Sequence, residues 1–337
     1  MLFRSAGYLR PARRRAPGAQ SGASAGTDHT RSRLLHLYAA DLARSPDGQW
    51  WVVADRTQAP SGAGYALENR LMVSRAFPDL FRDMKVQHLA RFFATLRDSL
   101  ARAAPVPSGA PLIVLLTPGP YNETYFEHSY LARYLGFPLV EGSDLTVRNG
   151  CVWLKTLTGL ERVHGILRRL DDDYCDPLEL RDDSTLGVAG LSEVVRRGNV
   201  LLANGLGSSL LESGALLGYL PVLCQSLLGA SLRMPSVATW WCGDAKALQS
   251  VTAALDRLVI KPAFPQLRQE PVFGRGLGAR ERDALLARLQ EQPNNYVAQE
   301  VVQLSHAPVW ERSQTAAGAA TPGALARLQS RPVSMRV

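Results

Sequence analysis

AADLARSPDGQWWVVADRTQAPSGAGYALENR (residues 39–70) and RLVIKPAFP (257–265) are the stretches that decide the fold of this chain. The first contains two strand-like runs joined by SPDG, where Asp and Gly supply the conformations that a hairpin turn needs. We expect Asp41 and Asp55 of this hairpin to lie close together. The second is an apolar strand that carries Lys261, and a buried ammonium needs a partner such as a bound phosphate. A lysine that reaches solvent from the strand end is the alternative.

Composition and charge place the chain among globular proteins. Its 337 residues, 46% of them hydrophobic, suffice for about two globular units. The formal charge is +8, but residues 1–33 hold seven Arg, no Lys and one acid, so the remainder carries only +2. Because no stripe of basic and aromatic residues crosses the folded part, we expect no direct binding of nucleic acid.

The N-terminal segment, the apolar runs and the cysteines bear on location. Prolines and glycines interrupt residues 1–33, which predicts a disordered basic leader. No run of about 18 apolar residues occurs, which argues against a membrane span or membrane partner. The four cysteines are 24, 49 and 18 residues apart. These spacings match neither a metal-binding Cys pair nor the dense disulfide framework of a small secreted protein. We therefore expect a cytoplasmic protein with reduced thiols.

Alternating strand-like and helix-like segments predict an α/β (α+β) fold. The apolar run at 110–120 is typical of a parallel strand buried on both faces, and Asn149-Gly150 predicts a type I′ hairpin. Apolar residues spaced by three and four predict helices over 65–81 and 85–104. The final RPVSMRV alternates like a strand, and a strand that reaches the last residue suggests a fragment of a longer protein.

Seven motifs in a fixed order resemble the circularly permuted ATP-grasp type 2 family, from about residue 34 to the C-terminus. They are DRTQAPSGAGYALENR, TPGPYNETYFEHSYLARYLGFPLVEGSDL, RRLDDDYCDPL, NVLLANGLGSSLLES, PSVATWWCG, LVIKPAFP and YVAQEVVQLS. In ATP-grasp ligases the phosphate-binding lysine normally precedes the metal carboxylates, and the reversed order here is what a permutation implies. The family is distantly similar to the synthetase domain of glutathionylspermidine synthetase.

The resemblance implies an ATP- and Mg²⁺-dependent ligase that joins a carboxylate to an amine through an acyl phosphate. Small-molecule or peptide carboxylates and amines would be its substrates. It places Asp41 and Asp55 on Mg²⁺, and Lys261 on the nucleotide phosphates. Gln299 and Glu300 fall where ATP-grasp folds line the adenine pocket. Solvated or surface-paired carboxylates are the alternative for the two aspartates, and a polar pair facing water is the alternative for Gln299 and Glu300.

Two further groups of residues are candidates for substrate binding. Ser61 and Gly62 begin a helix whose backbone amides can hold an anion, although a turn that only caps the helix is the alternative. The resemblance makes Ser61, Gly62 and Arg70 candidates for holding a substrate carboxylate or phosphate. Arg168 and Arg169 follow a strand directly. Ligands collect at the carboxyl ends of strands, so we expect these arginines to meet the acyl-acceptor substrate. An internal network with the three aspartates that follow is an alternative of equal weight.

The sequence departs from the family pattern in three places. Ala54-Asp55-Arg56 stands where the family commonly has Glu-Asp-Asn, so two expected oxygen ligands are missing. The Gly-rich loop after the lysine strand is replaced by AFPQLRQEPVFGRGLG, and Glu212-Ser213-Gly214 replaces an Asp-Asp-Lys. The second hypothesis is therefore a degenerate, catalytically inactive ATP-grasp module that acts as a binding or scaffold protein for an unknown partner.

The resemblance divides the chain into five expected parts. They are a disordered basic leader (1–33), the metal-end part of the ATP-grasp domain (34–109), an open α/β substrate domain (110–200), a helical segment with the nucleotide-binding part (201–310), and a linker with a truncated strand (311–337). The expectation of an open α/β domain at 110–200 is based on the β-α-β succession of its segments.

Overall fold

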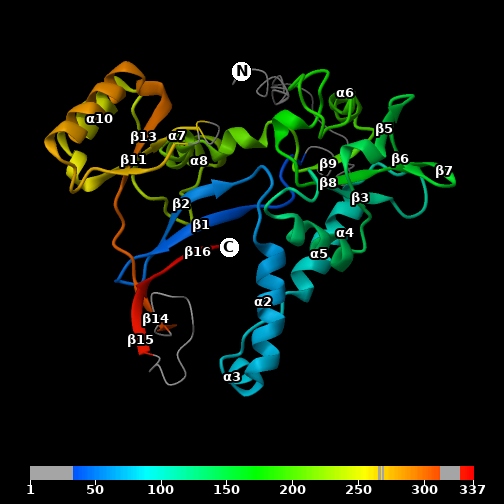
Figure 1. Ribbon diagram of the computed structural model, residues 1–337, viewed down its shortest axis with the longest axis horizontal. Coiled ribbons are helices and arrows are strands. Elements are labelled where there is room, and N and C mark those ends of the chain that lie inside the picture. Colours follow the sequence, from blue (N-terminus) through cyan, green and yellow to red (C-terminus); the bar gives the residue numbers. More distant parts are fainter. Residues whose placement is uncertain (1–32, 265–266, 268, 312–326) are drawn as a thin grey trace, which may run out of the picture. The chain divides into compact units, whose positions relative to one another are not determined.

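The computed structural model describes residues 33–264, 267, 269–311 and 327–337. The chain forms two compact units (Figure 1): unit 1 holds Met1–Tyr38 and Thr57–Leu210, and unit 2 holds Ala39–Arg56 and Leu211–Val337. The expected part 34–109 is thus divided, with its hairpin in unit 2 and residues 57–109 in unit 1. The expected leader up to residue 32, and residues 312–326 of the expected linker, lie outside the described residues.

Unit 1 is built on a parallel four-stranded sheet in the order β4-β3-β8-β9. Its strands are β3 (Ile113–Leu116), β4 (Leu139–Val140), β8 (Gly165–Arg168) and β9 (Leu201–Ala203). Every residue of β3 is buried, as an unbroken apolar strand with both faces covered should be. This confirms the parallel strand predicted within 110–120.

Alternation along β3 divides its side chains between two cores. Ile113 and Leu115 join one core, and Val114 and Leu116 join the other. The first core is completed by helices α2 (Ala63–Ala76), α4 (Ala90–Ala103) and α5 (Tyr125–Leu135). The second is completed by α6 (Leu191–Arg196) and by the antiparallel strands β5 (Leu145–Arg148), β6 (Cys151–Thr156) and β7 (Gly159–Val163).

One turn of unit 1 follows the sequence prediction and one helix departs from it. Between β5 and β6, Asn149 and Gly150 have φ of 51° and 69°, the positive values that a type I′ hairpin needs. The single helix predicted over 65–81 is instead α2 and the short α3 (Pro78–Asp83), separated at Phe77. The helix breaks there because the residue before a proline avoids the helical conformation.

Unit 2 contains two antiparallel sheets and a two-stranded ribbon. The first sheet, in the order β16-β1-β2, consists of β1 (Ala39–Arg44), β2 (Trp50–Arg56) and β16 (Ser334–Arg336). The second, in the order β10-β13-β11-β12, consists of β10 (Thr239–Trp241), β11 (Leu258–Pro262), β12 (Val272–Phe273) and β13 (Tyr296–Glu300). The ribbon pairs β14 (His306–Glu311) with β15 (Arg327–Pro332).

Helices cover both faces of the second sheet. On one face, α9 (Ala245–Ala253) and α10 (Ala279–Glu291) form an apolar core with β11 and β13. On the other face, α7 (Gly214–Leu217) lies so close that a Cβ on Gly214 would be 2.9 Å from a Val297 methyl. Leu217 of α7 also packs in the core of the β1–β2 hairpin, and α8 (Leu220–Leu228) follows it. The hairpin therefore meets the second sheet through α7.

Candidate functional site

Lys261 on β11 and Gln299 on β13 share one face of the second sheet. Val259 lies opposite Gln299, and Lys261 opposite Val297, so alternation places both polar side chains on the same side. Lys261 Nζ donates a hydrogen bond of 2.5 Å to Gln299 Oε1. Gln299, only 3% exposed, donates through Nε2 to the Val53 carbonyl of β2 at 2.9 Å. The lysine strand and the hairpin are thus connected through one buried amide.

A β-bulge in the hairpin explains why the Val53 carbonyl is available. The register shifts between Asp41, which lies opposite Ala54, and Leu42, which lies opposite Val52. Val53 is the extra residue, with no partner residue in β1. Its carbonyl therefore accepts from Gln299 instead of a neighbouring strand.

Asp41 is held between two arginines. Arg56 donates to Oδ2 through Nε and Nη2 at 3.0 and 2.8 Å, and Arg336 donates to Oδ1 through Nε at 2.6 Å and to Oδ2 through Nη2 at 3.2 Å. Oδ2 thus accepts three of these bonds and Oδ1 accepts one, so each carboxylate oxygen is bonded to a guanidinium group. Burial raises the pKa of Asp41, but the bonds from Arg336 and Arg56 outweigh that effect and lower the pKa. Asp41 is an ionised anchor for two guanidinium groups.

Lys261 belongs to the same electrostatic group. Burial lowers its pKa, the charge of Arg56 lowers the pKa further, and the charge of Asp41 opposes both effects. We call Asp41, Arg56, Lys261 and Arg336 the Lys261 cluster. With three cations and one anion, the cluster has an excess of positive charge that attracts anions.

Asp41 and Asp55 do not form the expected metal pair. Asp41 lies opposite Ala54 and Asp55 lies opposite Ala40, so the two carboxylates point to opposite faces of the hairpin. The expectation that the hairpin brings them together was wrong, because the strand register pairs each aspartate with an alanine and not with the other aspartate. Within the described part of the chain, no group of three or more His, Cys, Asp or Glu side chains is placed to hold a metal ion.

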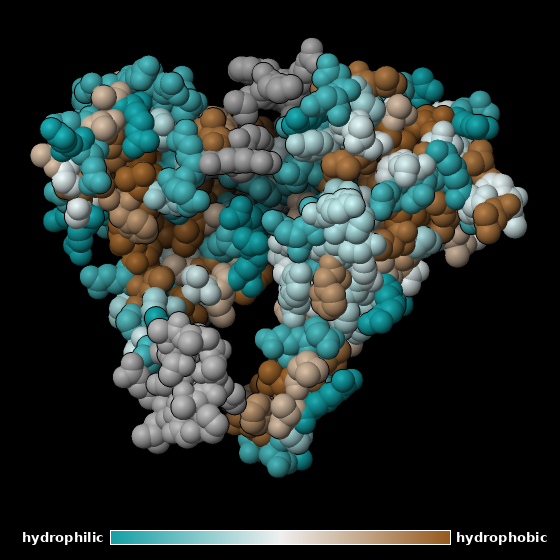
Figure 2. All heavy atoms as spheres, viewed as in Figure 1, coloured by the Kyte–Doolittle hydropathy of each residue, from teal (hydrophilic) through white to brown (hydrophobic). Residues whose placement is uncertain are grey.

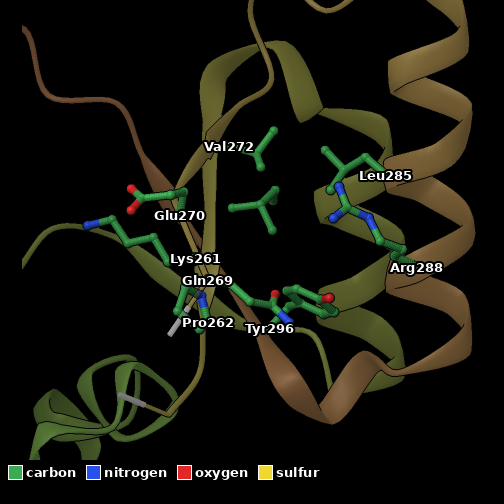
Figure 3. Close-up of a pocket in the computed structure, with 9 residues that line it drawn as sticks. Lys261, Pro262, Gln269, Glu270, Val272, Leu285, Arg288 and Tyr296 are labelled. Atoms are coloured by element: carbon green, nitrogen blue, oxygen red, sulfur yellow. The ribbon is translucent and has the colours of Figure 1, made fainter. Parts of the chain in front are cut away.

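Gln299 and Glu300 also point to opposite faces, so they do not line one adenine pocket together. Glu300 is exposed and lies opposite Leu258, a core residue. A cavity of about 310 Å³ lies between β11 and α10, lined by Ile260, Lys261, Pro262, Gln269, Glu270, Val272, Leu285, Arg288 and Tyr296. The ammonium end of Lys261 points away from Leu285 and Arg288 (Figure 3). The cavity and the Gln299 contact are therefore on different sides of β11.

In unit 1, a carboxylate of the chain already binds the start of α2. Glu127 of α5 is 0% exposed, and its Oε1 accepts from the amides of Gly62 at 2.8 Å and Gly64 at 2.9 Å. Arg169 donates through Nη2 to the Pro60 carbonyl at 2.7 Å and lies 3.9 Å from Glu127 Oε2. The helix start that we expected to hold a substrate anion thus has an internal partner.

Ser61 lies within this turn, but Arg70 contacts a different segment. Arg70 is about 10 Å along α2 from its first residue, and it donates to the carbonyl of Gln87, which follows α3. It borders a groove of about 230 Å³ whose lining is otherwise mostly apolar: Ala66, Asn69, Val73, Phe77, Leu80, Phe81, Met84 and Val86. Figure 2 shows hydrophobic surface at this α3 end. Arg70 therefore supports the α2–α3 end rather than the turn at Ser61.

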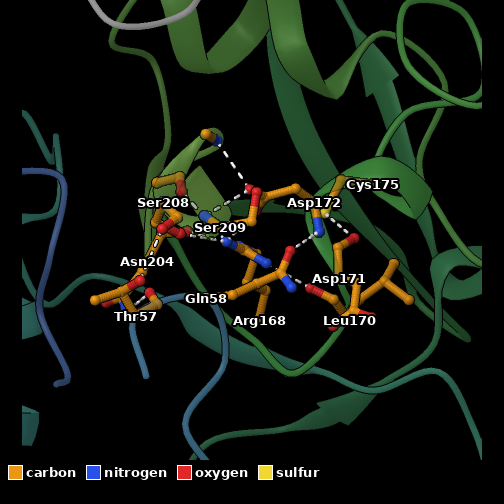
Figure 4. A network of polar contacts seen from close by, with 12 residues as sticks. Thr57, Gln58, Arg168, Leu170, Asp171, Asp172, Cys175, Asn204, Ser208 and Ser209 are labelled. Atoms are coloured by element: carbon orange, nitrogen blue, oxygen red, sulfur yellow. Dashed lines mark hydrogen bonds and ion pairs between the residues drawn. The ribbon is translucent and has the colours of Figure 1, made fainter. Parts of the chain in front are cut away.

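Arg168 lies at the centre of a buried polar network (Figure 4). Arg168 is 1% exposed, and its guanidinium group forms an ion pair with Asp172. It also donates hydrogen bonds to Asn204 O at 2.6 Å, Leu170 O at 2.6 Å, Gly205 O at 3.2 Å and Ser208 Oγ at 3.0 Å. All three guanidinium nitrogens therefore have a partner within the fold. Asp172 Oδ2 in turn accepts from the amides of Gly207 and Ser209. This geometry favours the internal Arg–Asp network over substrate contact.

Arg169 and His128 are buried beside this network. Burial lowers the pKa of Arg169, while Glu127 acts in the opposite sense. His128 is bonded through Nδ1 to Thr117 Oγ1 at 2.9 Å and through Nε2 to Thr124 Oγ1 at 3.0 Å. Burial and the charge of Arg169 lower the pKa of His128 to about 3. His128 is therefore a neutral, packed residue at physiological pH.

Comparison with known proteins identifies the family. The family described as circularly permuted ATP-grasp type 2 matches residues 19–337. The chain belongs to this family. The expected family and the ATP-grasp-like α/β fold are confirmed. In this ATP-grasp chain, the lysine strand β11 follows the β1–β2 hairpin in the permuted order.

Several proteins resemble this ATP-grasp chain. An uncharacterized protein of Mycobacterium tuberculosis is 41% identical over 308 residues, which are 91% of this chain and 33% of that protein. An uncharacterized protein of Synechocystis sp. is 38% identical over 273 residues, 81% of this chain and 57% of that protein. A glutathione synthetase-like effector from Globodera pallida aligns with a TM-score of 0.49 at 15% identity, covering 89% of this chain and 71% of that one. This chain spans between a third and just over half of the two sequence relatives.

Sequence reasoning missed two residues that shape these sites. Arg336 lies in β16, and the alternation of RPVSMRV predicted the strand but not its pairing with β1. Glu127 precedes Leu131 and Leu135 by four and eight residues on α5, so helical periodicity places it on the buried face of that helix. That spacing is the signal that could have identified it.

In the portion of the ATP-grasp chain that is described, no helix has the length and apolar composition to cross a bilayer.

Proposed function

We propose that this ATP-grasp chain binds ATP through the Lys261 cluster and contributes to joining a carboxylate to an amine. The observation that carries the proposal is the position of Lys261, which the buried Gln299 fixes beside Arg56 and Asp41. In the reaction, a carboxylate oxygen attacks the γ-phosphorus and ADP leaves. The amine nitrogen then attacks the acyl carbon, phosphate leaves, and the nitrogen loses a proton to solvent. Cations placed in advance stabilise the negative charge that develops on the phosphate oxygens.

Magnesium belongs to the chemistry that the family implies, but the expected ligands do not fit a shared ion. Asp41 accepts hydrogen bonds from Arg56 and Arg336, and Asp55 points to the other face of the hairpin. We therefore assign no step to a metal. The proposed substrates, a small-molecule or peptide carboxylate and an amine, follow from family membership. The four free cysteines support a cytoplasmic location.

A second candidate function is a nucleotide-binding module without ligase activity. The pairing of Asp41 with two arginines favours it, because ATP-grasp chemistry ordinarily needs acidic ligands for its metal. Both candidates use the same nucleotide site. They differ in whether bound ATP is consumed.

ATP is expected to raise the melting temperature of the wild-type protein, and Lys261→Ala is expected to abolish this rise. A ligand at about 100 times its Kd adds about 2.7 kcal/mol to the free energy of unfolding. Lys246→Ala is the matched control, since Lys246 is an exposed lysine of the same unit, and this variant should respond like the wild type. Differential scanning fluorimetry with Mg-ATP measures the shifts. An equal shift in the Lys261→Ala protein would contradict the proposed site.

Product analysis separates the two candidates. Release of ADP and phosphate should require both a carboxylate and an amine if the chain is a ligase, and a screen of amino acids, polyamines and peptides tests this. ATP binding without turnover across the whole screen would favour the module without ligase activity.

A further inference from the structure

The Lys261 cluster supplies positive charge at the place where an ATP-grasp site would use a metal ion. Arg56 and Arg336 bind Asp41 at 2.8 and 2.6 Å, and their side chains are 35% and 38% exposed. Because they are partly exposed, an anion arriving from solvent can reach both guanidinium groups. Lys261 is held by its bond to Gln299, and the charges of Arg56 and Asp41 act on it.

A divalent cation fits this cluster poorly. Mg²⁺ binds through oxygen ligands, mainly carboxylates and waters, but each Asp41 oxygen already accepts from an arginine. An Mg²⁺ ion bound to Asp41 would lie next to the two guanidinium groups, whose like charge repels it. Free ATP carries two more negative charges than Mg-ATP, and guanidinium groups bind phosphate oxygens in bidentate fashion. The cluster therefore matches the free nucleotide better than its magnesium complex.

We propose that the Lys261 cluster binds the phosphate groups of its nucleotide directly, so that nucleotide binding needs no divalent cation. The proposal rests on the proposed function, because it takes the nucleotide site to be at Lys261. Asp41 then orients Arg56 and Arg336, and both guanidinium groups bind the phosphates. Asp41 is a positioning residue in this arrangement rather than a metal ligand.

Isothermal titration calorimetry with ATP tests the proposal on the wild-type protein, in excess EDTA and in excess MgCl₂ at equal ionic strength. ATP is expected to bind at least as tightly in EDTA as in MgCl₂. Arg56→Gln is expected to weaken binding in EDTA by about tenfold, the value of one charge-assisted hydrogen bond. Arg282→Gln is the matched control, because Arg282 is 36% exposed and pairs with Asp256 at 2.7 Å in the same unit.

The possible outcomes separate the two proposals. Binding that requires MgCl₂ would overturn the metal-independent site and leave the proposed nucleotide site intact. Absence of ATP binding in both buffers would overturn the proposed function itself. Equal affinities of Arg56→Gln and Arg282→Gln would show that Arg56 does not contact phosphate. The comparison of the two buffers uses only the wild type, so it holds even if a variant does not fold.

Discussion

Arg168→Met is expected to lower the free energy of unfolding by about 3–5 kcal/mol, because removing one partner of a buried ion pair leaves the other charge uncompensated. Asp172, 2% exposed, would keep its charge without the guanidinium that it now binds. The carbonyls of Leu170, Asn204 and Gly205 would also lose a donor. Chemical denaturation followed by circular dichroism measures the loss.

Two comparisons make the Arg168 prediction specific. Arg196→Met removes an exposed arginine that pairs with Glu179 and Glu193 in the same unit, and surface pairs contribute only about 0–1 kcal/mol. Adding Asp172→Asn to Arg168→Met should recover part of the loss, since the buried charge is gone while an oxygen can still accept from Gly207 and Ser209. A stable Arg168→Met protein that has lost only turnover would support the substrate-binding role and refute the network.

Glu127→Ala is expected to cause a loss of similar size, about 3–5 kcal/mol. The amides of Gly62 and Gly64 would lose their acceptor, and the buried Arg169 would lose the carboxylate that lies 3.9 Å from it. Amide hydrogen exchange of these two glycines measures the local effect directly. Their protection should fall in the variant by more than the global loss of stability accounts for.

Glu127→Gln is the conservative comparison for this prediction. Its side-chain oxygen can still accept from Gly62 and Gly64, but it no longer balances the charge of Arg169. We expect the free energy of unfolding of Glu127→Gln to lie between those of the wild type and Glu127→Ala. If the two variants were equally destabilised, the hydrogen bonds to the turn would not be what Glu127 contributes.

Local sequence signals predicted much of the fold. The apolar run in β3 and the Asn149-Gly150 turn act over a few residues, and both formed as expected. The break at Phe77 was missed, although Pro78 gives it a local cause. The length suggested about two units, but which segments form each unit was not predicted, because the pairing of β1 with β16 joins segments from opposite ends of the described chain.

The candidate site was harder to predict, because its contacts join distant segments. Lys261 and its strand followed from the apolar pattern and the family motif, while its bond to Gln299 depends on the register between β11 and β13. Register also separates Asp41 from Asp55, since a shift of one residue moves a side chain to the opposite face. The ion pairs of Asp41 with Arg56 and Arg336 form only when β1, β2 and β16 lie side by side in the observed register. A sequence motif names such residues but does not specify which side chains they face.

A crystal structure of the protein with a non-hydrolysable ATP analogue, grown in EDTA, tests the central claim most directly. The account predicts phosphate oxygens within about 3 Å of Lys261 Nζ and of the Arg56 guanidinium. Phosphates bound at another place, with Lys261 still bonded to Gln299 and Arg56 to Asp41 alone, would contradict it.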